Sequence, residues 1–308
     1  MPAPTPPHIA RRLAAAIEPF VGQVYFAPEC HAAYAALGFK ASPGDANGVA
    51  LPDGAAYFTS RGSVMGQVHG AVVAAAFGVF NPAAVVPAVT YGWTLTDATT
   101  ICTARTEGAL AQLRRILGEE PNGLHRVVQL LLTAVEPLRP DGKPLFAGIS
   151  ALPMPEPPLG VAWRLGDMLR EYRGDAHIAA WTGAGFDPPE IGLLTERYWG
   201  LPPRSYVRTR AWRSDDLDRA EERLRSRGLL EADGSAMTEA GWAAREAVEV
   251  QTDQMCRPLT DALGEDADEL VALLAPWGAE IRARGGYLPS GPHDLAERFA
   301  RSCGPEGR

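Results

Sequence analysis

The most unusual polar stretch of the sequence is Leu169-Arg170-Glu171-Tyr172-Arg173-Gly174-Asp175-Ala176-His177-Ile178, and its candidate site residues lie around Gly174. A neutral histidine can act as a base or accept a hydrogen bond, and an arginine can clamp a carboxylate. The glycine predicts a corner between two helices, with Asp175 capping the second helix and His177 in its first turn. There the helix dipole disfavours a protonated imidazole, so we expect His177 to be neutral near pH 7. His177 and Asp175 are therefore candidate catalytic residues and Arg173 a candidate ligand-binding residue; the alternative is a plain helix corner with a packed histidine.

Two further groups offer candidate ligand-binding residues. The first contains Tyr25, Phe26 and Glu29, although Glu29 also suits the first turn of a helix simply because the helix dipole favours a carboxylate there. The second contains Tyr57 and Arg61. An arginine beside aromatic side chains can bind an anionic ligand. It can equally tie the two halves of the chain together by a salt bridge, and the sequence leaves both options open.

Common cofactor and catalytic motifs are absent from the sequence. It has no GxGxxG after a strand, no GxxxxGK[ST], no GxSxG and no HExxH. The four cysteines are far apart and include no CxxC pair, which argues against a zinc site or a disulfide framework and fits a reducing compartment. We therefore expect no metal site, and the sequence identifies no cofactor.

The composition predicts a globular chain. It has 308 residues, of which 46% are hydrophobic and 21% are charged, enough for two domains with their own cores. The formal net charge is -8, which counts against nucleic acid as a partner because DNA-binding proteins usually carry a basic face. The apolar run 71–78 is too short to span a bilayer, and the first residues do not read as a signal peptide. We expect a cytoplasmic protein without a membrane partner.

The stretch Trp212–Gly241 predicts how the second half of the chain folds. Ser214 suits a helix N-cap, and Gly228 suits the left-handed position just after the end of that helix. Asp233-Gly234 indicates a tight hairpin turn, and Thr238 can cap the next helix. A helix, a short strand, a hairpin and a helix in this order are typical of the second half of a winged helix.

The same residues resemble the recognition helix and wing of MarR-type winged-helix proteins, most closely in Arg227-Gly228-Leu229-Leu230 and Met237-Thr238-Glu239-Ala240-Gly241. The whole chain also resembles an actinobacterial family of helix-turn-helix proteins with no assigned activity. That resemblance rests on Tyr25-Phe26-Ala27-Pro28-Glu29, Phe80-Asn81-Pro82 and Leu169-Arg170-Glu171. Both resemblances imply a helix-turn-helix architecture, and neither supplies a substrate.

The charges depart from those of the DNA-binding relatives that this resemblance implies. In such proteins the recognition helix enters the major groove, and basic groups contact the phosphates. Here the helix begins with Asp215, Asp216 and Asp218, and the wing at 231–235 has no lysine or arginine. These carboxylates repel phosphate, so DNA is a possible but disfavoured partner. One group of arginines before the helix favours DNA binding: Arg204, Arg208, Arg210 and Arg213.

A repeat indicates that the chain is duplicated. The run Asp53-Gly54-Ala55-Ala56-Tyr57-Phe58-Thr59 matches Asp233-Gly234-Ser235-Ala236-Met237-Thr238, with one residue inserted. We therefore predict a mainly α fold with two pseudo-repeated winged-helix domains and small β-wings. The predicted limits are 1–136 for a degenerate winged helix, 137–158 for a linker rich in proline and glycine, and 159–308 for the MarR-like winged helix. We also expect a loose start at 1–7 and a short helix after Pro289.

Two functions fit these observations. The first is a small-molecule (metabolite) binding protein on a tandem winged-helix scaffold with weakened DNA binding, whose inter-domain cleft can also support catalysis. Tyr25, Phe26, Tyr57 and Arg61 would reach this cleft from the first half, and the stretch 173–177 from the second. The second function is a ligand-responsive DNA-binding transcriptional regulator with the same cleft as its effector site. A DNA affinity that falls with salt would distinguish the regulator from the binding protein.

Overall fold

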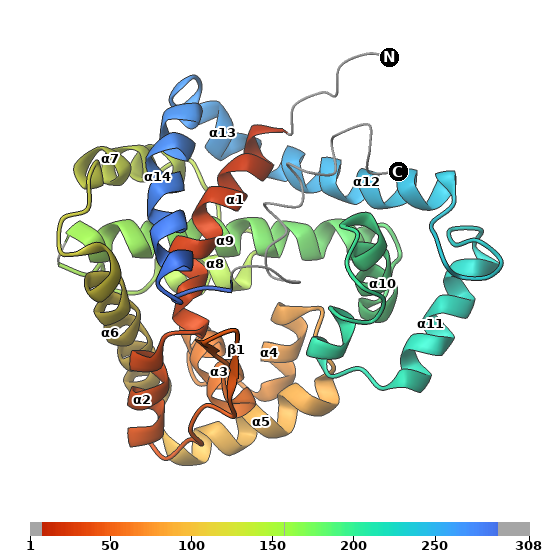
Figure 1. The fold of residues 1–308 in the computed structure, drawn as a ribbon, viewed down its shortest axis with the longest axis horizontal. Coiled ribbons are helices and arrows are strands. Elements are labelled where there is room, and N and C mark those ends of the chain that lie inside the picture. The colour runs from red at the N-terminus through yellow and green to blue at the C-terminus, as the bar shows by residue number, and fades with distance from the viewer. Residues whose placement is uncertain (1–7, 157, 289–308) are drawn as a thin grey trace.

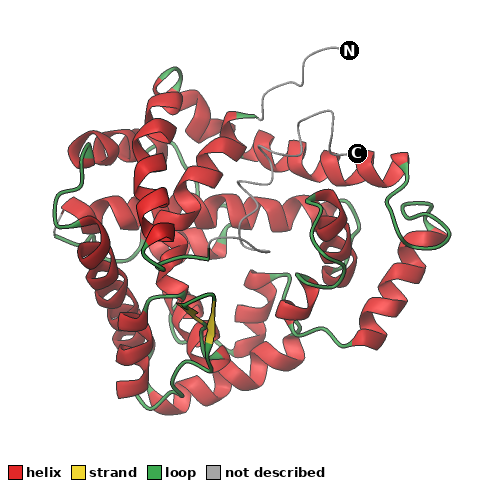
Figure 2. Ribbon diagram, in the orientation of Figure 1, coloured by secondary structure: helices red, strands yellow, loops and turns green. Residues whose placement is uncertain are grey.

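The computed structural model of the chain describes residues 8–156 and 158–288. These residues are mainly helical, with one small two-stranded antiparallel sheet (Figure 2). The fold class predicted from the sequence is thus confirmed in its coarse form, as a mainly α protein with a small β element. The start at 1–7 and the helix expected after Pro289 lie outside the described residues.

Up to residue 150 the chain forms short and medium helices and one hairpin: α1 (Ile9–Gly22), η1 (Gln23–Tyr25), α2 (Pro28–Ala36), β1 (Asp45–Ala46), β2 (Val49–Ala50), α3 (Gly54–Gly62), η2 (Ser63–Met65), α4 (Gly70–Phe77), α5 (Pro82–Leu95), α6 (Ala98–Leu117), α7 (Leu124–Val135) and α8 (Pro144–Ser150). From residue 158 on it forms further helices: α9 (Pro158–Gly183), α10 (Pro188–Tyr198), η3 (Val207–Arg210), α11 (Ser214–Ser226), α12 (Glu239–Met255), α13 (Arg257–Leu263) and α14 (Asp266–Ala283).

Helix α9 crosses the middle of the molecule (Figure 1). It packs against α1, α7, α8 and α12, and it buries large side chains along its whole length, among them Trp163, Leu169 and Trp181. The helix continues through Gly174, where the sequence predicted a corner between two helices. A glycine inside a helix costs only about 1 kcal/mol relative to alanine. The packing of α9 against its neighbours offsets this cost, so the predicted corner is wrong.

In the part of the chain that the structure describes, most buried apolar side chains belong to one of two clusters. The larger cluster joins the helices from α1 to α8, the part of α9 up to Tyr172, and the last helices α13 and α14. The smaller one joins the end of α9 from Ala180 to α10, α11 and α12. The boundary between the two clusters therefore falls within α9. The predicted linker at 137–158 contains α8, which packs against α9. The predicted limits of two domains, at 1–136 and 159–308, stay a prediction.

Helix α11 has the amphipathic pattern that the sequence predicts. Its buried stripe faces α10 and consists of Leu217, Ala220 and Leu224. The helix begins at Ser214, and the N-cap is Arg213, one residue before the predicted cap. The Asp216 carboxylate, in the first turn, accepts a hydrogen bond from the Arg213 backbone N–H at 3.4 Å and so satisfies the amide of the N-cap residue.

The hairpin after α11 also follows the predicted order. Gly228 has a φ of 70° just beyond the helix, which glycine tolerates best. A single bridge joins Leu230 to Met237, and the Thr238 side chain caps α12 by accepting from the Gly241 N–H. In the first half, α2, the β1–β2 hairpin and α3 follow one another in the same order. The order of helix, hairpin and helix therefore occurs twice in the described residues.

Candidate functional site

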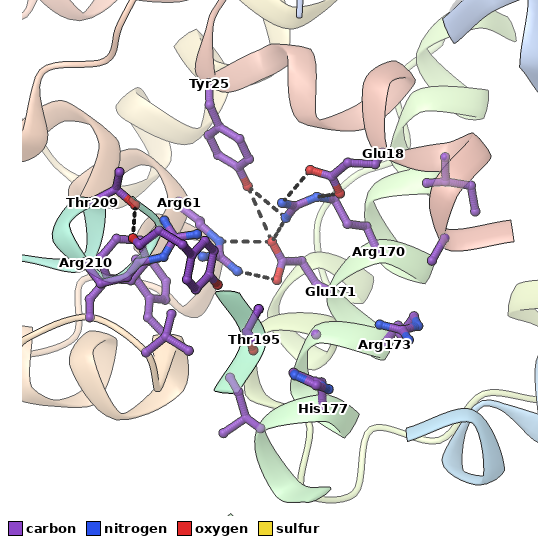
Figure 3. Close-up of a pocket in the computed structure, with 18 of the residues that line it drawn as sticks. Glu18, Tyr25, Arg61, Arg170, Glu171, Arg173, His177, Thr195, Thr209 and Arg210 are labelled. Carbon is purple, nitrogen blue, oxygen red and sulfur yellow. Dashed lines mark hydrogen bonds and ion pairs between the residues drawn. The ribbon is translucent and has the colours of Figure 1, made fainter. Parts of the chain in front are cut away.

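A cavity of about 620 Å³ lies between α1, α3, α9, α10, η3 and α12. Figure 3 shows charged and aromatic side chains from several of these elements pointing toward a common space. A volume of this size is in the range of small-molecule sites, which combine apolar walls with a few placed polar groups. The polar and charged residues of its wall come from segments far apart in the sequence, and they include Arg11, Glu18, Tyr25, Arg61, Arg170, Glu171, Arg173, His177, Thr195, Arg210, Arg245 and Glu249.

Most of the ligand-site residues named from the sequence lie on this wall. Those that line the cavity are Tyr25, Phe26, Tyr57, Arg61, Arg173 and His177. The rings of Tyr25 and Tyr57 are in edge-to-face contact with their centroids 5.1 Å apart, although the residues are separated by 32 positions. Because α9 is one continuous helix, positions 173 and 177 lie one turn apart on the face that it presents to the cavity.

Asp175 and Glu29 lie outside the cavity wall. Position 175 is on another side of α9, and its carboxylate accepts hydrogen bonds from the backbone N–H groups of Leu145 and Phe146 at 3.1 and 3.0 Å. Asp175 therefore caps the start of α8 and not a second half of α9. Glu29 stands in the first turn of α2 and pairs with Arg115 at 2.6 Å. Neither carboxylate touches the other predicted site residues, because each serves a helix start instead.

The buried carboxyl of Asp175 predicts an unusual dependence of stability on pH. Burial raises its pKa from 3.8 to about 7, although the hydrogen bond from Phe146 opposes the shift. Between these values the folded chain binds more protons than the unfolded chain, so this group lowers stability as pH rises from about 4 to 7. Asp175→Asn keeps an oxygen acceptor for α8 and removes the titration. We expect the melting temperature of this variant, followed by circular dichroism, to fall less than that of the unchanged chain over this range. Parallel curves would contradict the assignment.

Glu171 is the electrostatic centre of the cavity wall. Arg61 donates two hydrogen bonds to it, from Nε to Oε1 at 3.0 Å and from Nη2 to Oε2 at 2.7 Å, and Arg170 donates a third at 2.8 Å. Burial by itself raises the pKa of Glu171, but the guanidinium groups of Arg61 and Arg170 outweigh burial and hold this pKa at about 2. Arg61 thus forms a salt bridge between α3 and α9, which is the second of the two roles that the sequence left open for this arginine. The sequence places Glu171 within its polar stretch at 169–178 but does not mark it as a site residue, because its partner lies 110 positions away.

His177 is a neutral hydrogen-bonding group on the same wall, six positions after Glu171 on α9. Burial lowers its pKa to about 3, and the nearby cations Arg245 and Arg173 act in the same direction. Its Nδ1 lies 3.0 Å from the Thr252 hydroxyl, which itself donates to a backbone carbonyl. The imidazole must therefore donate from Nδ1, which leaves Nε2 as an acceptor. A group with this pKa is a weak base near neutral pH, so its neutrality arises from burial and not from the start of a helix.

The arginines of α11 are all engaged by carboxylates. Arg219 pairs with Asp216 at 2.6 Å, Arg225 pairs with Glu222 at 2.8 Å, and Arg223 pairs with Asp187 and Glu190. Helix α11 has three arginines and five acidic residues, which gives a formal charge of 3 − 5 = −2. The helix that would enter a major groove is therefore acidic, and its cations are partly neutralised before any phosphate approaches.

The four arginines before α11 do not form one patch. Arg204 pairs with Asp218 at 2.6 Å, and Arg210 lines the cavity. Arg208 and Arg213 are exposed. Neither of these two side chains has a carboxylate partner among residues 8–156 and 158–288. They are the basic groups nearest to the N-terminal end of α11 that remain open to an anionic partner.

In the described part of the chain no helix is long and apolar enough to cross a membrane. No group of three or more histidine, cysteine, aspartate and glutamate side chains there could hold a metal ion. In the comparisons with known proteins, the model of a family described as a helix-turn-helix family matches residues 10–289. No curated protein and no solved structure matches the chain.

Proposed function

The chain belongs to a helix-turn-helix family, and from this premise we propose that it is a DNA-binding transcriptional regulator that responds to a small molecule held in the cavity. The helix-turn-helix of this proposal consists of α10 and α11, which pack on each other in the smaller apolar cluster. The hairpin at 229–237 serves as the wing. This is the alternative function considered from the sequence, and the family favours it over a binding protein that has lost its DNA partner.

One observation carries the regulatory part of the proposal, namely the shared wall between the cavity and the helix-turn-helix. Thr195 on α10 and Thr209 and Arg210 on η3 line the cavity. Helix α11 begins four residues after Arg210. A ligand that contacts η3 can therefore change the position of the first turn of α11. A ligand shifts such an equilibrium only if it binds one arrangement more tightly than the other.

The DNA contacts in this proposal come from the exposed arginines before α11. The arginines within α11 are held by carboxylates and are therefore less available to phosphate. Arg208 and Arg213 have no such partner among the described residues and would contact phosphates beside the groove. Phosphate contacts supply most of the sequence-independent affinity, and that affinity falls with salt. We therefore expect weak DNA binding that is clearest at low ionic strength.

Fluorescence anisotropy of labelled duplex DNA tests this proposal. We expect the full chain to bind a duplex from upstream of its own gene, with an affinity that falls as salt rises. The double variant Arg208→Ala and Arg213→Ala should weaken binding and reduce the slope of log K against log salt by about 2. Arg139→Ala, at an exposed site outside the helix-turn-helix, serves as the matched control and should leave the slope unchanged. Absence of binding to any duplex at low salt would overturn the regulator.

A second candidate is a metabolite-binding protein on the same scaffold without a DNA partner. The acidic charge of α11 favours it, because carboxylates at 215, 216 and 218 stand where phosphates would approach. Such a protein would ignore DNA at every salt concentration, and its ligand would raise its melting temperature. The predicted catalytic role of His177 adds little here, since a pKa of about 3 suits hydrogen bonding better than proton abstraction.

We also propose that the second winged helix is of the MarR type and that the two halves arose by duplication. The repeated order of helix, hairpin and helix, α2 to α3 and α11 to α12, supports duplication. Asp53 caps α3 and Thr238 caps α12, each from the end of a hairpin. Within the proposal, the first copy has become part of the cavity wall through Tyr57 and Arg61.

A further inference from the structure

Among residues 8–156 and 158–288, the charges around the cavity are balanced except for one. Six arginines line it, and five of them are paired with carboxylates that lie on the wall or directly behind it: Arg11 with Glu246 and Asp253, Arg61 with Glu171, Arg170 with Glu18 and Glu171, Arg173 with Glu249, and Arg245 with Glu249. The sixth is Arg210, which has no carboxylate partner among the described residues. The wall thus carries one guanidinium charge that no carboxylate in the described part of the chain neutralises.

Arg210 is held in a fixed position. Its guanidinium lies 4.3 Å from the ring centroid of Tyr206 and 4.7 Å from that of Phe80. Its backbone carbonyl accepts from the Asn81 N–H at 2.9 Å, and the Asn81 side chain donates to Ala211 at 3.1 Å. A planar group stacked on two rings and anchored through its backbone presents its N–H donors in a prearranged direction. The Arg210 Nε is buried without a hydrogen-bond partner.

The neighbouring wall is apolar and aromatic. Phe77 and Phe80 have ring centroids 6.1 Å apart, and Arg61 stacks on Phe77 as Arg210 stacks on Phe80. Figure 3 shows the two arginines on the same side of the cavity. Trp181 also lines the cavity, and its buried indole N–H has no hydrogen-bond partner. A buried donor without an acceptor costs free energy that a bound acceptor would restore.

We propose that the cavity binds a largely apolar organic molecule with a single negative charge, whose acidic group is held by Arg210. The rings at positions 77 and 80 contact the apolar body, and the Trp181 N–H offers a second donor. One uncompensated cation selects one negative charge, because a second anionic group would face the carboxylates of Glu171 and Glu18. This inference rests on the proposed function only for the effect of the ligand on α11, which it would exert through η3. The binding site itself does not depend on that function.

A pair of fluorescent probes tests this inference. The probes are 1-anilinonaphthalene-8-sulfonate, an apolar monoanion, and N-phenyl-1-naphthylamine, the same body without the sulfonate. We expect the full chain to bind the anion more tightly than the neutral probe. Arg210→Met should weaken binding of the anion by roughly tenfold or more, and that of the neutral probe by less than about twofold. The matched control is Arg208→Met, on the same short helix but exposed, which should leave both affinities unchanged.

Two further measurements keep the result interpretable. Circular dichroism establishes that each variant is folded, and Arg210→Lys, which keeps the charge but loses the planar fork, should retain part of the preference for the anion. Equal affinities of the unchanged chain for the two probes, or an undiminished preference in Arg210→Met, would overturn the inference. DNA binding is measured separately by anisotropy. A chain that prefers the anion through Arg210 but does not bind DNA would support this site and refute the regulator. A chain that binds DNA but does not prefer the anion would refute this site and support the regulator.

Discussion

Replacing Glu171 by glutamine is expected to lower the free energy of unfolding by about 3–5 kcal/mol, because it leaves two partly buried guanidinium groups without their shared anion. Arg61 and Arg170 converge on this carboxylate from α3 and α9, and burial keeps water from replacing it. A loss of 1 kcal/mol lowers the melting temperature of chains approaching this size by about 2–4 °C. The melting temperature in a thermal scan should therefore fall by roughly 10 °C.

The matched control is Glu29→Gln. Glu29 also pairs with an arginine, Arg115, but that arginine side chain is half exposed. Exposed ion pairs contribute about 0–1 kcal/mol, so this variant should melt close to the unchanged chain. A loss for Glu171→Gln no larger than the loss for Glu29→Gln would show that the cavity wall does not depend on the buried carboxylate.

The same variant makes a prediction about acid. The pKa of Glu171 is depressed from 4.5 to about 2, so the unfolded chain binds more protons than the folded chain between these values. The stability that Glu171 contributes is therefore complete above about pH 4.5 and is lost as pH falls toward 2. Over this range the melting temperature of Glu171→Gln should fall less steeply than that of the unchanged chain. His177 titrates in both chains and cancels from the comparison.

Local patterns made part of the fold predictable. The order of helix, hairpin and helix from α11 to α12 depends on caps, turns and apolar spacing within about thirty residues, and the cap at Thr238 is where the sequence placed it. The aromatic and basic candidates Tyr25, Tyr57 and Arg61 were chosen for their chemistry, and all three line the cavity. Glu29 and Asp175 were chosen in the same way and lie outside it, so side-chain type indicated part of the wall and none of the partners.

Contacts between distant segments explain what the sequence could not reveal. Glu171 acquires its role from Arg61, 110 positions away, and no local spacing encodes that pair. Gly174 looked like a break because glycine is weakly disfavoured in helices, yet tertiary packing carries α9 through it. The arginines at 208 and 210 looked like one basic cluster. On the turns of η3, however, one is exposed and the other is drawn into the cavity by Phe80 and Tyr206.

Replacing Gly241 by alanine is expected to lower the free energy of unfolding by roughly 2 kcal/mol or more, although alanine is the better helix former. Gly241 lies in the first turn of α12, where an added Cβ would stand 2.1 Å from the carbonyl oxygen of Leu229. That carbonyl cannot withdraw freely, because it accepts a hydrogen bond from the Thr238 N–H at 3.2 Å. The hairpin would have to separate from α12, so the variant should also bind DNA more weakly if the hairpin serves as a wing.

The matched control is the same substitution at Gly174, inside α9. There the nearest atom to an added Cβ is the Glu171 Oε2 at 3.4 Å, an ordinary contact, and the backbone is helical. Alanine should therefore raise stability by about 0.5–1 kcal/mol through helix propensity alone. Thermal melts of the two variants should shift in opposite directions. If Gly241→Ala melted higher than the unchanged chain, the close approach between hairpin and helix would be refuted; a lower melting temperature for Gly174→Ala would instead count against a continuous α9.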